Sequence, residues 1–295
     1  MSGDLPVLVV TTTAAWPDAL AAQRRLLNRH LRDAYRFLVV VNTPVEPSQS
    51  NLWDRTMRDR TIAMAHETAD EVIVVPPEVH QDRRTLFPRT IARRAADTNA
   101  TLMHADALQY TWNTRLRGCG TAAMILDSDM FPIRDFSIRE QLGANILIGL
   151  PQHRRRRFPP REVTYLWSGL ALFDFARMPH QDHWSYDVGF VAGIRLDGGG
   201  QTARWLDRLT PPERAQVGTM RSFHSGAWTA QDLPADLPEP VRDFILTDDR
   251  NRAGTLYCEY FLDCLLHYRG GGSNWQNEEA AIVTARQQRL LAALQ

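Results

Sequence analysis

The chain has 295 residues, with 34 basic and 34 acidic side chains, so its formal net charge is zero. It contains no lysine, which excludes Schiff-base enzymes and the two commonest ATP sites, because each of these uses one. A site for a phosphate group must therefore rely on arginine, histidine, backbone N–H groups or a metal ion.

The rest of the composition is typical of a folded globular protein, with 44% apolar and 23% charged residues. No apolar run reaches the ~18 residues that cross a bilayer, and residues 1–6 lack the basic start of a secretory signal. The three cysteines form no C-x-x-C pair, which fits reduced thiols. We therefore expect a cytoplasmic protein without a membrane span.

Strand and helix patterns alternate through the first 130 residues. The β-branched run Leu5–Thr12 indicates a strand buried on both faces, and Pro17 suits the first position of a helix. Further buried strands are predicted at 37–41, 71–75 and 121–126, with a strong amphipathic helix at 99–117. This order predicts an α/β fold with a mainly parallel sheet flanked by helices.

The second half of the chain is less regular. Strands are predicted at 145–150 and 165–173, and the very basic segment 153–161 between them is predicted to be irregular. Short helices and loops are expected over 202–255, followed by a final amphipathic helix at 278–295. We expect one domain over 1–295, in which the second half, 136–295, completes a site begun by the first half, 1–135.

Two carboxylates follow the predicted strand at 121–126. Asp127 and Asp129 stand at its C-terminal tip, the edge of an open α/β sheet where ligands bind. If the chain turns there, as Pro132 suggests, both side chains can approach one hard cation such as Mg²⁺ or Mn²⁺. The alternative is a solvated acidic turn or a helix cap.

This acidic strand end resembles the D-x-D motif of the GT-A class of nucleotide-sugar glycosyltransferases. The resemblance implies a Rossmann-like GT-A fold, a nucleotide-diphosphate sugar donor, and a divalent metal that bridges the two donor phosphates. Carried over to this chain, it makes Asp127 and Asp129 the acidic pair and places Ser128 against the nucleotide.

A second segment, His267–Trp275, resembles the H-x-x-G-x-x-K-P-W element of glycogenin-like retaining GT-A transferases. The resemblance implies that His267 is the third metal ligand and that Gly270 and Trp275 belong to the donor site. Ser273 stands where the family has a phosphate-binding lysine, so Arg269 is the candidate for that role. The alternative is a glycine-rich loop beside a histidine that serves only packing.

Other donor contacts are expected from three places. Ser168 and Gly169 resemble the small residues that begin a GT-A strand beside the donor sugar, although an ordinary core strand fits them as well. Thr11 and Thr12 end the first strand, where these folds contact the nucleoside. His104 and Arg115, on the helix before the acidic strand, are further candidates, with packing or surface roles as the alternative.

Further candidates belong to the acceptor side. Asp197, and after it Asp187, are candidate catalytic bases that deprotonate an acceptor hydroxyl, with a turn-forming aspartate as the alternative. The arginine run is either a solvated loop or an anion-binding rim, and tryptophans near it can stack on sugars or bases. The candidate rim residues are Arg154, Arg155, Arg156, Arg157, Trp184 and Trp228.

The resemblance thus implies a metal-dependent hexosyl- or pentosyltransferase that uses Mn²⁺ or Mg²⁺, with a nucleotide-binding half over 1–135 and an acceptor-binding half over 136–295. Its acceptor is expected to be a glycan, a small molecule or a modified nucleic-acid base. One alternative is a sugar-nucleotide nucleotidyltransferase, although the basic loop such enzymes carry after the first strand is missing here. A second alternative is a non-enzymatic nucleic-acid-binding module that uses the arginine run.

Overall fold

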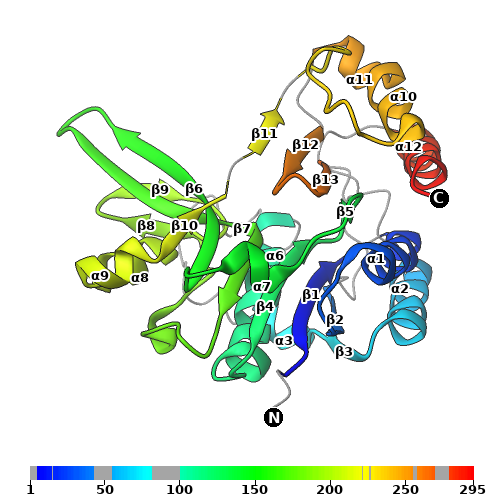
Figure 1. Cartoon of the computed structure of the whole chain (residues 1–295). Coiled ribbons are helices and arrows are strands. Elements are labelled where there is room, and N and C mark those ends of the chain that lie inside the picture. The colour runs from blue at the N-terminus through cyan, green and yellow to red at the C-terminus, as the bar shows by residue number, and fades with distance from the viewer. Residues whose placement is uncertain are drawn as a thin grey trace.

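A computed structural model of the chain describes residues 5–14, 16–42, 55–81, 100–220, 222–225, 227–254, 258–269 and 279–295. A seven-stranded sheet with the order β10-β6-β7-β4-β1-β2-β3 forms its centre (Figure 1). The strands are β1 (Val7–Thr13), β2 (Tyr35–Val41), β3 (Glu71–Val74), β4 (Ala122–Asp127), β6 (Leu147–Arg156), β7 (Arg161–Asp174) and β10 (Val217–Thr219). Neighbours pair in parallel except where β7 meets β4 and β6, so the predicted mainly parallel α/β sheet is confirmed.

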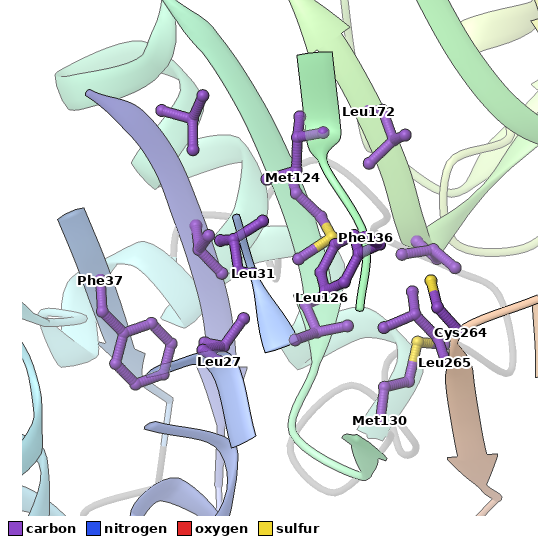
Figure 2. Packing of buried hydrophobic residues seen from close by; sticks show 14 of the residues in the cluster. Leu27, Leu31, Phe37, Met124, Leu126, Met130, Phe136, Leu172, Cys264 and Leu265 are labelled. Carbon is purple, nitrogen blue, oxygen red and sulfur yellow. The ribbon is translucent and has the colours of Figure 1, made fainter. Parts of the chain in front are cut away.

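Helices cover both faces of this sheet, because alternate residues of each central strand point to opposite sides. One face packs against α1 (Pro17–His30), α2 (Arg55–Thr68) and α7 (Ile138–Leu142). Figure 2 shows part of this layer, in which Leu27 and Leu31 lie near Phe37, and Met124 and Leu126 near Phe136. The opposite face packs against α3 (Pro77–Gln81), α6 (Ala100–Thr111), the π-helical turn η1 (Trp112–Leu116) and α8 (Thr202–Arg208). α9 (Pro211–Ala215) follows α8.

A second sheet of four strands, in the order β11-β12-β13-β5, stands beside the C-terminal end of β4 (Figure 1). Its strands are β11 (Ser222–Ser225), β12 (Cys258–Phe261), β13 (Leu265–Tyr268) and β5 (Met130–Pro132). The apolar core beneath it also takes side chains from α1, α10 (Glu239–Thr247) and α12 (Ala280–Ala293), and α11 (Asp249–Arg252) adjoins α10. Only Ser128 and Asp129 separate β4 from β5, so the chain crosses from one sheet to the other at the acidic segment.

The basic segment 153–161 differs from its prediction. β6 continues through Arg156 and β7 begins at Arg161, and the two residues face each other at the end of a hairpin that projects from the body (Figure 1). Charged side chains do not prevent this, since the ladder is made by backbone groups and an exposed hairpin keeps its arginines in water. The prediction of irregular chain was therefore wrong.

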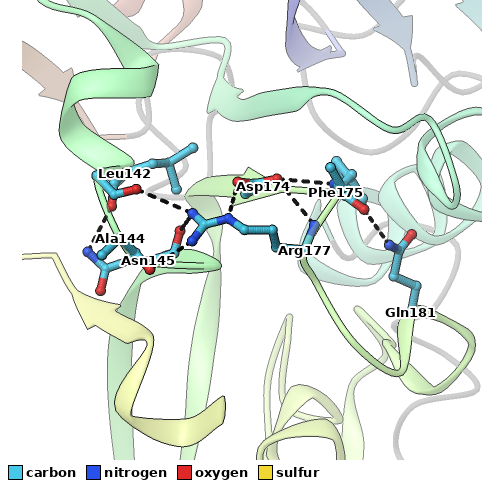
Figure 3. A network of polar contacts seen from close by, with 9 residues as sticks. Leu142, Ala144, Asn145, Asp174, Phe175, Arg177 and Gln181 are labelled. Atoms are coloured by element: carbon cyan, nitrogen blue, oxygen red, sulfur yellow. Dashed lines mark hydrogen bonds and ion pairs between the residues drawn. The ribbon is translucent and has the colours of Figure 1, made fainter. Parts of the chain in front are cut away.

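The inner end of β7 is held by a polar network around Arg177 (Figure 3). The Arg177 guanidinium pairs with Asp174 and donates to the carbonyls of Ala144 and Asn145. Gln181, in the short helix η2 (Gln181–His183), donates to the Phe175 carbonyl at 2.8 Å. Since Asp174 pairs with the first residue of β4, this network anchors the end of β4 opposite Asp127.

A short hairpin of β8 (Gly189–Val191) and β9 (Ile194–Leu196) packs beside β6 and completes the fold. The helices in the described ranges include none with the length and apolar character that crossing a membrane requires.

Candidate functional site

The crossing between the sheets brings Asp127, Asp129 and His267 together. β5 pairs with β13 so that Met130 lies opposite His267, and the Tyr268 N–H donates to the Asp129 carbonyl at 2.8 Å. One ligand atom from each of the three side chains lies within 4.8 Å of the others, and His267 Nε2 is 3.4 Å from Asp129 Oδ1. The structure therefore gathers the acidic pair and the histidine at one point.

The three side chains fit a divalent cation in chemistry and geometry. Two carboxylates and an imidazole nitrogen are a donor set that Mn²⁺ accepts. Two ligands about 2.1 Å from a six-coordinate cation are about 3 to 4 Å apart, and the 3.4 Å between His267 and Asp129 lies in that range. Asp129 and His267 are buried, whereas Asp127 is partly exposed, which leaves room for a ligand on its side.

Glu259 orients the histidine. It lies opposite His267 in the β12–β13 pair, and its Oε2 is 2.8 Å from His267 Nδ1. With Nδ1–H donating to this carboxylate, the ring is held so that Nε2 faces Asp129. A carboxylate behind a ligating histidine is a common feature of metal sites.

The local charges shift two pKa values. Burial is the largest cause of the rise in the pKa of Asp127 to about 6, and Asp129 adds to it while His104 and His267 oppose it. Burial by itself lowers the pKa of His267, but the Asp129 and Glu259 carboxylates outweigh it and raise that pKa to about 10. The pocket thus has excess negative charge, which a proton on His267 partly neutralises and a cation would neutralise better.

Gly169 gives the Asp127 carboxylate its space. A Cβ atom at this position would lie 2.4 Å from Asp127 Oδ2 and 2.4 Å from the ring of Trp167. The Trp167 ring in turn lies 5.5 Å from the His267 ring, centroid to centroid. On the other side, His104 Nε2 is 3.4 Å from Asp127 Oδ1. Of the residues predicted to bind the donor, Gly169 and His104 therefore touch the acidic pair directly.

Gln23, on α1, holds the turn itself and was not among the predicted residues. Its side chain is fully buried, and Nε2 donates to the carbonyls of Asp127 at 2.7 Å and Met130 at 2.8 Å. One amide thus clamps both ends of the Ser128–Asp129 crossing. A glutamine on the apolar side of an amphipathic helix is the signal that would have found it.

The other predicted donor residues lie at different distances from this centre. Thr12 is aligned with Asp127 across β1 and β4, and the Thr11 and Thr12 hydroxyls are buried without a hydrogen-bond partner in the described chain. Ser128 and Ser168 are buried next to the acidic pair and Gly169. Arg115, by contrast, binds Glu71 at 2.8 Å on the edge strand β3, three strands from β4.

Arg269 follows His267 by two residues and is partly exposed. Its Nε lies 4.0 Å from Glu259 Oε2, and its carbonyl accepts a hydrogen bond from Arg250 at 3.3 Å. The remaining predicted residues of this segment lie outside the described residues: Gly270, Ser273 and Trp275.

The two candidate bases have different surroundings. Asp197 accepts hydrogen bonds from the Tyr165 hydroxyl at 2.6 Å and from Arg154 at 3.1 Å. Asp187 lines a groove of about 620 Å³ between residues 182–190 and α8. A Cβ atom at Gly199, in the turn before α8, would lie 2.3 Å from the Leu166 carbonyl and 3.3 Å from the Ser168 nitrogen. The turn before α8 therefore lies close to the strand segment that contains Gly169.

The predicted rim residues do not form one surface. Trp184 is buried, stacked on Trp112 at 5.2 Å, with part of it reaching the groove. Trp228 is buried in the core under the second sheet, and its indole N–H donates to the Cys258 carbonyl at 3.3 Å. The four arginines of the run, Arg154, Arg155, Arg156 and Arg157, lie instead on the projecting hairpin.

No protein-family model matches the chain, and no curated protein matches it. Three of the solved structures similar to it are glycosyltransferases. The galactosyltransferase LgtC, in complex with donor and acceptor sugar analogs, is 14% identical with a TM-score of 0.41 over 97% of this chain and 96% of that one. Mouse xyloside xylosyltransferase 1 is 13% identical with a TM-score of 0.33 over 73% and 78% of the two chains.

The third structure, core-mannan synthase A from Aspergillus fumigatus in its Mn/GDP form, is 10% identical with a TM-score of 0.34 over 61% of this chain and 63% of that one. The similar structures are thus glycosyltransferases, the class that the D-x-D resemblance predicted. All three TM-scores are below 0.5, and the functional proposal below rests on the geometry of the site.

Proposed function

We propose that the chain is a metal-dependent glycosyltransferase that moves a hexosyl or pentosyl group from a nucleotide-diphosphate donor to an acceptor in the cytoplasm. One observation carries the proposal: the neighbouring residues Asp127 and Asp129 and the distant His267 gather ligand atoms within 4.8 Å at the C-terminal edge of the sheet. That edge is where open α/β sheets bind nucleotides.

In this proposal Asp127, Asp129 and His267 hold Mn²⁺ or Mg²⁺. The cation, when bound, neutralises charge that develops on the departing diphosphate. Glu259 keeps the His267 ring in its orientation, and Gly169 leaves the space that the Asp127 carboxylate occupies.

Further donor contacts belong to the same proposal. Arg269 adds positive charge where a family lysine is missing, and its guanidinium suits a phosphate group. The remaining proposed donor contacts are Thr11, Thr12, His104, Arg115, Ser128, Ser168, Gly270, Ser273 and Trp275. Among them Arg115 has the weakest support, because its guanidinium is already paired with Glu71.

The acceptor is proposed to enter through the groove beside α8. Its lining combines carboxylate, amide and guanidinium groups with aromatic rings, a combination that suits a hydroxyl-rich molecule such as a sugar. Asp187 lines this groove, whereas Asp197 is held by Tyr165 and Arg154. We therefore place the acceptor-side carboxylate at Asp187. No observation on the described residues favours the nucleotidyltransferase or the nucleic-acid-binding alternative.

The proposal is tested by hydrolysis of a panel of UDP-, GDP- and TDP-sugars with Mn²⁺. We expect the wild type to release nucleotide diphosphate from one donor class only when the metal is present. Asp129→Ala should lower that rate about 100-fold or more. Without this ligand the cation is held poorly, so the negative charge that develops on the diphosphate in the transition state loses its stabilisation. Absence of metal-dependent turnover and of donor binding across the panel would refute the proposal.

Isosteric substitutions distinguish the roles of the two candidate bases, Asp187 and Asp197. Once an acceptor is known, Asp187→Asn should lower the transfer rate about 100-fold, as for loss of a general base. Asp197→Asn should mainly lower the melting temperature, because it weakens the contacts to Tyr165 and Arg154. The reverse pattern would move the acceptor-side carboxylate to Asp197.

A further inference from the structure

The end of the β6–β7 hairpin, residues 153–162, is named here the hairpin tip. It is the green hairpin that projects at the upper left of Figure 1. All of its residues are exposed except Arg156, which is partly buried. The next residues inward, such as Val163 and Tyr165, are already buried in a small core with β8 and β9. The tip therefore has no packing role that accounts for its composition.

The hairpin tip concentrates the positive charge of the molecule. It contains five arginines and one glutamate, a formal charge of +4, so in a chain of zero net charge all other residues together carry −4. Arg154 pairs with Asp197, and Arg155 with Glu162. Arg157 and Arg161 are exposed and form no ion pair with any residue that the structure describes.

An apolar side chain stands between these two arginines. Phe158 is 81% exposed, the largest value among the exposed large hydrophobic residues of the described chain. Pro159 and Pro160 follow it, so the apex reads Arg157-Phe158-Pro159-Pro160-Arg161. A large exposed apolar group flanked by cations is unfavourable in water but suits an interface between lipid headgroups and acyl chains.

We propose that the hairpin tip docks the protein onto an anionic lipid surface, with Phe158 at the level of the headgroups and Arg157 and Arg161 against their phosphates. The basic cluster supplies electrostatic attraction to anionic headgroups, and the apolar side chain adds buried apolar area, the two contributions that determine interfacial binding. This inference is independent of the proposed glycosyltransferase activity, because it uses no residue of the metal centre.

The charge distribution favours a planar surface over a flexible polyanion. A nucleic acid that binds the tip tends to fold back along the protein, where it meets a body of charge −4. An anionic bilayer contacts only the projecting apex and repels the rest of the molecule, which carries a charge of −4. The charge distribution therefore orients the protein on the bilayer. Phe158 also stands at the apex rather than on a face of the hairpin where successive bases would stack.

The test is co-sedimentation of the full chain with vesicles of phosphatidylcholine and phosphatidylglycerol, against vesicles of phosphatidylcholine alone. We expect binding only to the anionic vesicles, weakening as salt is added. Arg157→Gln/Arg161→Gln should weaken binding about 25-fold, at about fivefold per arginine near the surface. Phe158→Ser should weaken it about tenfold. All these side chains are exposed, so the variants should keep the wild-type melting temperature.

Arg117→Gln/Arg252→Gln is the matched control, because it removes two exposed arginines outside the hairpin tip that form no ion pair with any of the described residues. It should change vesicle binding less than twofold. An equal loss in both double variants, or no binding to anionic vesicles, would overturn the proposal. It would also be overturned if the wild type bound a single-stranded oligonucleotide more tightly than the vesicles at the same salt and Phe158→Ser left vesicle binding unchanged.

Discussion

At the scale of single residues, the metal centre depends on two side chains that are not ligands. Gly169 is adjacent to Asp127 on the neighbouring strand and has no Cβ, and Gln23 fixes the backbone on both sides of Asp129. Neither choice follows from secondary-structure preference, since glycine weakens a strand and a buried amide needs partners. Both are explained by the position of the acidic pair.

Gly169→Ala tests the close approach at Asp127. The new methyl group would lie 2.4 Å from a carboxylate oxygen, so either the carboxylate or the strand must move by about 1 Å. A displacement of that size at a reacting centre costs about 100-fold in rate, and we expect this loss in metal-dependent donor hydrolysis.

Gly149→Ala is the control for that substitution, because its methyl group would meet only the side-chain carbons of Leu166 and Leu147, at 3.2 and 3.3 Å. It should retain most of the hydrolysis rate. Full activity in Gly169→Ala would show that the space beside Asp127 is not needed.

Gln23→Met tests the clamp on the turn. Methionine keeps the volume of glutamine but donates no hydrogen bond, so the Asp127 and Met130 carbonyls lose their partner. Each buried group left unpaired costs about 1 to 3 kcal/mol, and we expect the free energy of unfolding in urea to fall by about 2 to 4 kcal/mol. Mn²⁺ affinity, measured by calorimetry, should fall with it. Unchanged affinity in a destabilised variant would limit Gln23 to a role in folding.

At the scale of elements, charged residues at strand ends fix how the layers join. Asp70 lies just before β3, where its carboxylate accepts the Phe37 N–H of β2 at 2.7 Å and pairs with Arg24 of α1 at 2.9 Å. Burial acts to raise the pKa of Asp70, but the Phe37 N–H and the Arg24 guanidinium outweigh it and lower that pKa overall. One carboxylate therefore ties a helix to two strands.

Asp70→Asn should lower the free energy of unfolding by about 1 kcal/mol at neutral pH, because it removes the charge while keeping an acceptor for Phe37. A carboxyl group whose pKa is lower in the folded state than in the unfolded state stabilises the fold. This stabilisation is fully present at pH values above its unfolded pKa of about 3.9. The difference from wild type should therefore vanish as the pH falls below about 3 in urea unfolding.

Asp182→Asn serves as the control, since the Asp182 side chain is 66% exposed. It should change the free energy of unfolding by less than about 0.5 kcal/mol at any pH. A difference for Asp70→Asn that persists in acid would assign its effect to packing rather than to charge.

The lengths of the strands explain which of them the sequence predicts and which it does not. Strands β1, β2 and β4 are long apolar runs buried on both faces, and such runs are visible without any partner. β5, β12 and β13 have three or four residues each, too few to show a period of two. Their position depends on pairing between segments more than 130 residues apart, such as His267 with Met130.

The residues of the candidate site differ in the same way: the sequence predicts some of them, and only the pairing of the strands places the others. The chemistry of Asp127, Asp129 and His267 was available from residue type and from resemblance, but Glu259 was not, because only the β12–β13 register places it behind the histidine. For Arg115, the sequence indicates the helix that carries the residue but not the contacts that its side chain makes. Its place on the correct helix suggested a role at the nucleotide, whereas its ion pair with Glu71 depends on the helix's rotation and on the edge strand.

At the scale of the whole molecule, the metal centre is a junction between two sheets. Asp127 ends a strand of the large sheet, His267 belongs to the small one, and Asp129 lies in the crossing between them. The two sheets have separate apolar cores that both use residues of α1. A cation held by all three ligands would therefore link the two layers and stabilise the folded chain as well as serve a reaction.

We accordingly expect Mn²⁺ to raise the melting temperature of the wild type. A ligand that binds only the folded state adds about 2.7 kcal/mol at 100 times its Kd, which is about 5 °C for a protein of this size. Asp129→Asn and His267→Ala should lose this shift, and a chelator should reverse it in the wild type. Glu162→Gln, an acidic residue on the exposed hairpin, should keep the full shift. A shift of equal size in all four proteins would mean that Mn²⁺ acts elsewhere, and the two sheets would then be joined by their packing alone.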